Sequence, residues 1–244
     1  MIEKSVAKII VDLLVEAGVR HVFGIVSIHN MPIVDAISAT PGIDLVTSRH
    51  EQGAAHMADG YARATGGLGV ALGSTGPGTT NMLTGLYEAD FASSRLLVIT
   101  GQAETGFYGK AKGYVHEAEN QKRMLEAVTD AVASPRYAHE VGPMLKGVIE
   151  AMYSGRPRPG AIEVPIDLQY ASIASPTLTI EVPRPIRPDT QTIEAAISRI
   201  DDADKRVIIA GGGVRTAEAR AALTAFAELL NAPVITTANG KGAF

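Results

Sequence analysis

The sequence predicts an α/β protein whose first part is a parallel sheet with helices on both faces. Segments with apolar residues at helical spacing alternate along the chain with short, continuously apolar segments, which are typical of strands buried on both faces. The chain has 244 residues, of which 46% are hydrophobic and 20% charged, the balance of a globular protein. Alternating strands and helices form βαβ units, so we expect a parallel sheet covered on both sides.

The elements of this first part follow from the patterns in order. Apolar residues on one face of residues 6–17 predict the first helix, and Gly18 then ends it. Apolar runs of strand length predict strands over residues 19–25, 43–47, 68–72, 96–100 and 160–165. Helical spacing predicts further helices over residues 31–38, 52–64, 79–91 and 141–152. The last helix tolerates Pro143 only in its first turn.

A long loop and a change of composition interrupt this alternation. From residue 101 to 119 the periodicity fails and glycines recur, and long loops in compact domains are often functional. Four prolines within residues 176–188 predict an extended linker. We therefore expect a first domain over residues 1–175, a linker over 176–189 and the start of a second domain over 190–244.

The second domain is predicted to be α/β as well. Helices are expected over residues 191–200 and 218–230, strands over 206–210 and 233–237, and a glycine turn at 211–213. Two strands can hardly bury a sheet of their own, so we expect the natural protein to continue beyond this chain.

Composition excludes several classes of function. The net charge of −4 disfavours binding to nucleic acid, and the absence of cysteine excludes a disulfide scaffold, a thiolate nucleophile and a cysteine-based zinc site. The N-terminus does not read as a signal peptide, and no apolar run approaches the roughly 20 residues of a membrane helix. We expect a soluble, cytoplasmic protein with neither a nucleic-acid nor a membrane partner.

Two motifs lie where predicted strands end, the edge at which open parallel sheets bind ligands. Glu51 begins a helix there, and its carboxylate can be buried against a ligand or can act only as a first-turn acid that stabilises the helix dipole. The segment Gly73–Asn81 is rich in glycine, serine and threonine, and the N–H groups of the helix that follows favour a polar or anionic group. The alternative is a plain loop with a threonine N-cap. It is not a P-loop, because no Gly-Lys-Ser/Thr follows.

Together these motifs resemble the pyrimidine-binding domain of the thiamine-diphosphate-dependent enzymes, in their acetolactate synthase-like group. The resemblance rests on Arg-His-Glu at 49–51, Met-Ala-Asp-Gly-Tyr-Ala-Arg at 57–63, Ser-Thr-Gly-Pro-Gly at 74–78 with Asn81, and Leu-Val-Ile-Thr-Gly-Gln at 97–102. Residues 155–168 resemble the end of that domain, and residues 208–242 the start of a Rossmann-like middle domain, incomplete here. The likeness covers nearly the whole chain; it is specific for the superfamily and much less so for the reaction.

The resemblance implies that Glu51 is catalytic. In the family, the matching glutamate hydrogen-bonds N1′ of the cofactor's pyrimidine and favours the imino form, whose 4′-nitrogen takes the thiazolium C2 proton. The cofactor then attacks a 2-oxo acid and acts as the electron sink. The residues that the resemblance places against the cofactor are Glu51, Val26, Ser27, Ser74, Thr75, Gly76, Pro77 and Asn81.

Some positions depart from the family pattern. Gly24-Ile25-Val26-Ser27 stands where many relatives have Gly-x-Pro-Gly, and Ile28, where some decarboxylases have an acidic or small polar residue, argues against a pyruvate-decarboxylase type. His29 is a candidate substrate contact, although a solvated loop histidine is the favoured alternative.

Val-His-Glu at 115–117 replaces the Phe-Gln-Glu of acetolactate synthases, and Ile166 a lysine. His116 is thus a candidate proton donor or substrate contact, with a surface histidine as the alternative. These differences favour a shared first step, attack on a 2-oxo acid and loss of CO₂, over any particular acceptor.

The resemblance also defines what this chain lacks. The family binds the cofactor's diphosphate through Mg²⁺ with a Gly-Asp-Gly motif in a C-terminal domain, and no Gly-Asp-Gly occurs here. We expect no metal ligand in this chain, and an isolated chain without activity. Because relatives bind the cofactor between subunits, a homodimer or dimer of dimers is implied. FAD binds some members and is not decided by these residues.

The function implied is a thiamine-diphosphate-dependent 2-oxo acid decarboxylase or carboligase, a lyase or transferase. A related decarboxylase or acyltransferase with another substrate is one alternative, and a non-catalytic binding or scaffold protein is another. A nucleotide-binding oxidoreductase is suggested only by the triple glycine at 211–213, which lacks the spacing of Gly-x-Gly-x-x-Gly.

Overall fold

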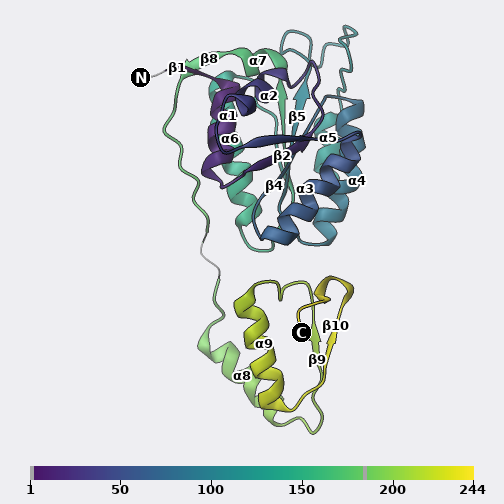
Figure 1. The fold of residues 1–244 in the computed structure, drawn as a ribbon, viewed down its shortest axis with the longest axis vertical. Coiled ribbons are helices and arrows are strands. Elements are labelled where there is room, and N and C mark those ends of the chain that lie inside the picture. Colours follow the sequence, from purple (N-terminus) through teal and green to yellow (C-terminus); the bar gives the residue numbers. More distant parts are fainter. Residues whose placement is uncertain (1–2, 184–185) are drawn as a thin grey trace. The chain divides into compact units, whose positions relative to one another are not determined.

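The computed structural model describes residues 3–183 and 186–244. The chain divides into two compact units, Met1–Pro183 and Arg184–Phe244. Within residues 3–183, a six-stranded parallel sheet has the strand order β3-β2-β4-β5-β7-β6, with helices packed on both faces (Figure 1). The α/β class with a parallel sheet is therefore confirmed.

The sheet comprises β2 (His21–Gly24), β3 (Asp44–Thr47), β4 (Gly69–Gly73), β5 (Leu96–Gln102), β6 (Ala131–Ala133) and β7 (Gly160–Pro165). The helices are α1 (Val6–Glu16), α2 (Met31–Ser38), α3 (Glu51–Thr65), α4 (Pro77–Phe91), α5 (Gln121–Glu126), α6 (Ala138–Tyr153) and α7 (Ile166–Tyr170). β1 (Glu3–Ser5) pairs antiparallel with β8 (Ser172–Ala174) beside the main sheet.

Alternating side chains of the strands divide the core into two layers. Leu97 and Ile99 of β5 face one cluster, which includes apolar residues of α1, α2 and α6. Leu96 and Val98 face the other cluster, formed with α3, α4 and α5. This period of two buries both faces of the strands, which explains why they read as continuously apolar runs.

The start of α6 differs from the prediction. The helix begins at Ala138 rather than at residue 141, so Pro143 lies inside it and not in its first turn. The Glu140 carboxylate accepts hydrogen bonds from the backbone N–H groups of Arg136 (2.8 Å) and Tyr137 (3.1 Å), which satisfies donors at the helix start and extends it. The proline removes one helical hydrogen bond in exchange.

The proline-rich segment lies partly on the first unit. Leu178 and Ile180 pack against the core that contains α1 and α6, and the first compact unit ends at Pro183. Pro185, one of the four prolines, lies outside the described residues. The domain limits at 175 and 190 stay a prediction.

The second unit contains α8 (Thr190–Asp201), β9 (Ile208–Ala210), α9 (Ala217–Leu230), β10 (Val234–Thr236) and a 3₁₀ turn (Ala238–Gly240). β9 and β10 pair in parallel with α9 between them in the chain, a βαβ unit. Across both units, the described helices are all too short or too polar to span a bilayer.

Candidate functional site

The predicted site residues gather at one edge of the first unit's sheet. Because β2, β3, β4 and β5 run parallel, the loops that follow them meet at their carboxyl ends. Val26, Ser27 and His29 lie after β2, and Glu51 begins α3 after β3. Ser74, Thr75 and Gly76 follow β4, Pro77 and Asn81 lie on α4, and His116 lies in the loop that follows β5.

Glu51 is the first residue of α3, and its side chain is directed toward α4 and not simply toward solvent. Its side chain is half-buried, and Asn81 Nδ2 donates a 2.9 Å hydrogen bond to Glu51 Oε2. The other oxygen faces the backbone of Gly78, where a Cβ would lie 3.3 Å from Glu51 Oε1 and 2.9 Å from Ser74 Cβ. Glycine at 78 thus lets Ser74 and the Glu51 carboxylate pack directly against the backbone of α4.

The loop after β4 depends on an unusual glycine. Gly76 is the N-cap of α4 with φ 58° and ψ −112°, a conformation that other residues rarely adopt. A Cβ there would lie 2.6 Å from the carbonyl oxygen of His116, so the two backbones touch. The threonine N-cap of the alternative reading is wrong, because Gly76 is the N-cap and Pro77 begins the helix.

His29 is buried, so the alternative of a solvated loop histidine is wrong. The residue is 1% exposed, and Nδ1 lies 3.1 Å from Ser74 Oγ, whereas the buried Nε2 has no hydrogen-bond partner within residues 3–183 and 186–244. Burial, followed by repulsion from His116, lowers the pKa of His29 below its usual value; the nearby Val115 carbonyl acts in the opposite direction. Both effects of the surroundings that lower the pKa favour the neutral ring.

His116 lies beside His29 but is exposed. The two ring centroids are 6.2 Å apart, and Tyr114 lies 5.9 Å from the His29 ring. His116 has a left-handed backbone, with φ 57°. The structure thus brings the two histidines together at the same edge of the sheet as Glu51.

The loop after β2 keeps a defined shape without the family's Gly-x-Pro-Gly. Val26 is half exposed, while Asn30 is buried and organises the loop. Asn30 Oδ1 accepts from the Ser27 N–H at 2.8 Å, and Asn30 Nδ2 donates to the Ile25 carbonyl at 3.0 Å. Sequence reasoning missed Asn30, whose only signal was its position just before a helix.

A buried polar network lies beneath the site and was also missed. Glu163 of β7 is fully buried and accepts hydrogen bonds from Gln102, Gln121, Tyr108 and Ser134. Burial, followed by the charge of Glu163, raises the pKa of Tyr108 to about 12, so its hydroxyl stays a donor. A charged residue inside the apolar strand 160–165 was a signal that could have located this network.

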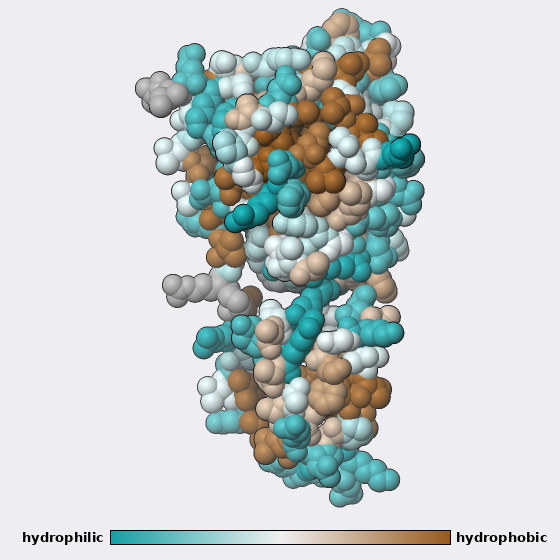
Figure 2. Space-filling view, in the orientation of Figure 1, coloured by the Kyte–Doolittle hydropathy of each residue, from teal (hydrophilic) through white to brown (hydrophobic). Residues whose placement is uncertain are grey.

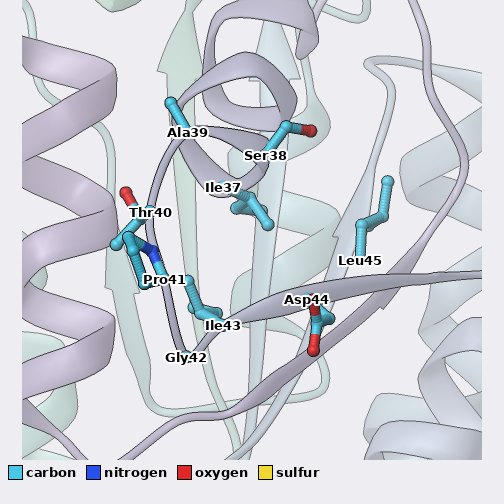
Figure 3. A pocket seen from close by; sticks show the side chains of 9 residues that line it. All are labelled: Ile37, Ser38, Ala39, Thr40, Pro41, Gly42, Ile43, Asp44 and Leu45. Atoms are coloured by element: carbon cyan, nitrogen blue, oxygen red, sulfur yellow. The ribbon is translucent and has the colours of Figure 1, made fainter.

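A hollow on the surface of the first unit has no part in this site. A surface pocket of about 520 Å³ is lined by residues 37–45, on the turn between α2 and β3 (Figure 3). Asp44 begins β3, so the pocket lies at the amino end of that strand, whereas Glu51 follows its carboxyl end. Among residues 3–183 and 186–244, no cluster of three or more acidic or histidine side chains is arranged to hold a metal ion.

Two family models match the chain. Residues 4–125 match the family model described as thiamine pyrophosphate enzyme, N-terminal TPP binding domain, and residues 193–244 match the central domain of the same enzymes. The chain is 37% identical over 235 residues to a probable 2-ketoarginine decarboxylase, AruI, of Pseudomonas aeruginosa, covering 96% of this chain and 42% of that protein.

Two further relatives have related activities in their names. A glyoxylate carboligase of Escherichia coli O157:H7 is 37% identical over 238 residues, which are 94% of this chain and 39% of the relative. The acetolactate synthase large subunit of Corynebacterium glutamicum is 34% identical over 242 residues, 98% of this chain and 38% of the relative. The chain thus spans about two fifths of the length of these relatives.

Proposed function

The chain belongs to the thiamine pyrophosphate enzymes, and from that premise we propose that the protein is a thiamine-diphosphate-dependent decarboxylase or carboligase acting on a 2-oxo acid. The names of the relatives support this proposal, because decarboxylation and carboligation of 2-oxo acids recur among them. The observation that carries it is the Glu51 carboxylate, held by Asn81 at the ligand-binding edge of the sheet.

Glu51 is the residue that we assign to the cofactor's aminopyrimidine ring. When bound, thiamine diphosphate supplies a carbon nucleophile and an electron sink for the loss of CO₂. Asn81 occupies Glu51 Oε2, which leaves Oε1 to hold or share a proton with the ring nitrogen. A side chain at Gly78 would crowd this carboxylate, so glycine there supports the assignment.

The loops on either side of Glu51 complete the proposed cofactor site. We assign Val26 and Ser27 to it on one side, and the segment from Ser74 to Pro77 on the other. The backbone of this segment is fixed by the Gly76 conformation and by the hydrogen bond from Thr79 Oγ1 to the Ser74 carbonyl at 2.8 Å. Prepositioned backbone groups bind a ligand without a further ordering cost.

His29 and His116 are the proposed substrate contacts. The buried Nε2 of His29 meets no hydrogen-bond partner among the described residues, although the Val115 carbonyl is near, and an unsatisfied buried nitrogen is costly unless a ligand bonds to it. Its lowered pKa keeps the ring neutral, so it orients a substrate oxygen by a hydrogen bond. His116 is exposed beside it and can exchange protons with solvent, as the delivery of a proton to product requires.

The assembly and metal requirement are part of the same proposal. Figure 2 shows apolar side chains gathered on one face of the first unit. Separately, Tyr87 and Phe91, one turn apart on α4, are 68% and 69% exposed. Such surfaces mark protein interfaces, which supports a homodimer or a dimer of dimers. Mg²⁺ would be held with the diphosphate by residues outside this chain, in an enzyme that we place in the cytoplasm.

The test is Glu51→Gln in the full-length gene product, assayed with thiamine diphosphate, Mg²⁺ and a panel of 2-oxo acids. We expect turnover to fall by at least about 100-fold, because the amide cannot give and take the ring's proton. Glu218→Gln is the matched control, since Glu218 is also a first-turn acid of a helix and should leave turnover unchanged. Unchanged turnover in Glu51→Gln would exclude the assigned role.

Measurements on the wild-type protein distinguish the enzymatic proposal from the alternative of a non-catalytic binding or scaffold protein. If it neither binds thiamine diphosphate in a calorimetric titration nor turns over any 2-oxo acid of the panel, the enzymatic proposal is wrong. Cofactor binding without turnover of any panel member would leave the binding protein as the better description.

A further inference from the structure

We propose that Gln121 is a positioning residue that sets the separation of the His29 and His116 rings by holding the backbones of Gly76 and Gly101. The proposal deepens the proposed function, because it rests on the two histidines being the substrate contacts. Gln121 is fully buried at the start of α5, so its side chain is not exposed to a bound ligand. Its influence has to pass through the neighbours to which it is hydrogen-bonded.

The two ends of the Gln121 amide join two different loops. Oε1 accepts from the Gly76 N–H at 2.8 Å and from Thr75 Oγ1 at 3.0 Å, both in the loop after β4. Nε2 donates toward the Gly101 carbonyl at 3.0 Å and Thr100 Oγ1 at 2.9 Å, both at the end of β5. One planar side chain therefore fixes the spacing between the loop after β4 and the end of β5.

Each of these backbones is in direct contact with one of the histidines. At Gly101, a Cβ would lie 2.3 Å from the His29 carbonyl oxygen and 2.5 Å from His29 Cβ. At Gly76, a Cβ would lie 2.6 Å from the His116 carbonyl oxygen. No side chain intervenes in either contact, so a shift of either glycine moves the histidine that rests on it.

Glu163 fixes which way the Gln121 amide faces. Glu163 Oε2 accepts from Gln121 Nε2 at 3.0 Å. A flipped amide would place its oxygen against this carboxylate and against the Gly101 carbonyl, and its NH₂ group against the Gly76 N–H. Both faces would lose their hydrogen bonds in a buried site, so only one orientation is compatible with the surroundings.

The closing experiment uses Gln121→Met in the full-length gene product, because methionine keeps the length of the side chain and removes its hydrogen bonds. Thr129→Val is the matched control. It removes a buried hydroxyl that is 2.5 Å from the Pro159 carbonyl, near the amino ends of β6 and β7 and so at the other edge of the sheet. Both variants are expected to lose stability, so stability alone does not decide between a positioning and a packing role.

Two readouts decide it. In spectra of protein labelled with ¹⁵N-histidine, we expect Gln121→Met to move the ring signals of both His29 and His116, and Thr129→Val to leave them in place. In steady-state kinetics, we expect Gln121→Met to raise KM for the 2-oxo acid about tenfold, since small misplacements of binding groups are costly. Unmoved histidine signals in a folded Gln121→Met protein would overturn the proposal.

A second variant keeps the test decisive if Gln121→Met does not fold. Thr75→Val removes the hydroxyl that lies 3.0 Å from Gln121 Oε1, 3.2 Å from Gln102 Oε1 and 3.4 Å from the His116 carbonyl oxygen. It should move the His116 signal more than that of His29, and equal or absent shifts would contradict the proposed route. The spectra do not depend on turnover, so a wild-type protein without 2-oxo acid activity would refute the proposed function and leave this test intact.

Discussion

Close packing of α3 on α4 is what brings Glu51 to Asn81, and a single methyl group should separate them. The two helices lie side by side (Figure 1), and Gly85 of α4 faces Ala55 of α3. In Gly85→Ala, the new Cβ would lie 2.5 Å from Ala55 Cβ. Because carbon atoms in contact sit at about 3.5–4.0 Å, the helices have to move apart there by about 1 Å.

This movement reaches the site because the same contact faces continue one turn earlier. Glu51 precedes Ala55 by four residues, and Asn81 precedes Gly85 by four, so the 2.9 Å hydrogen bond lies next to the clash. A shift of about 1 Å stretches it beyond hydrogen-bonding distance. Overpacking costs about 1–3 kcal/mol, and the better helix propensity of alanine offsets up to about 1 kcal/mol, so we expect a net loss of about 1–2 kcal/mol.

The assay is urea unfolding followed by tyrosine fluorescence, together with turnover of the 2-oxo acid. Gly60→Ala is the matched control, because Gly60 lies on the exposed side of α3 with nothing within 4 Å of a new Cβ. It should stabilise the protein by about 0.5–1 kcal/mol through helix propensity alone. The reasoning is refuted if Gly85→Ala is as stable and as active as Gly60→Ala.

Three further predictions concern the network and the histidines. Glu163→Gln turns an amide donor toward groups that donate to the carboxylate, and should lower the free energy of unfolding by about 2–4 kcal/mol in urea titrations, against no more than about 1 kcal/mol for exposed Glu126→Gln. His29 has a lowered pKa in the folded state, so below about pH 6.5 the unfolded chain takes up a proton that the folded ring resists. Stability should therefore fall as pH falls through this range, and less steeply in His29→Gln; identical slopes from pH 8 to 5 would contradict this. Gly76→Ala places a Cβ at a residue with positive φ and against the His116 carbonyl oxygen. It should raise KM for the 2-oxo acid at least tenfold, as measured by steady-state kinetics over a range of 2-oxo acid concentrations.

The longer elements of the fold could be predicted because their patterns are local. Helices such as α3 and strands such as β5 bury regular faces, and the spacing of their buried residues can be read directly from the order of residues in the chain. The pairing of β1 with β8 joins Glu3 to Ala174, and no local pattern announces a contact between residues so far apart. β6, with only three residues, and α5, with six, are likewise too short to show a period.

The candidate site divides along the same line. Glu51 and the glycine-rich loop belong to short motifs whose residue types are required by backbone shape and chemistry. Such motifs can be recognised in the sequence alone. The burial of His29 is different, because it comes from packing on Gly101, more than seventy residues away. The sequence around His29 does not indicate that Gly101 packs against it.

The amino-acid order alone therefore determined the alternation of helices and strands, the family and the identity of the central carboxylate. Only the folded chain decided that Asn81 binds this carboxylate, that one histidine is buried beside an exposed one, and that Gln121 and Glu163 brace the loops around them. Hydrogen bonds and backbone contacts between distant segments form only when the atoms are placed to within a few tenths of an ångström. Those distances arise only when the helices and strands pack together in three dimensions.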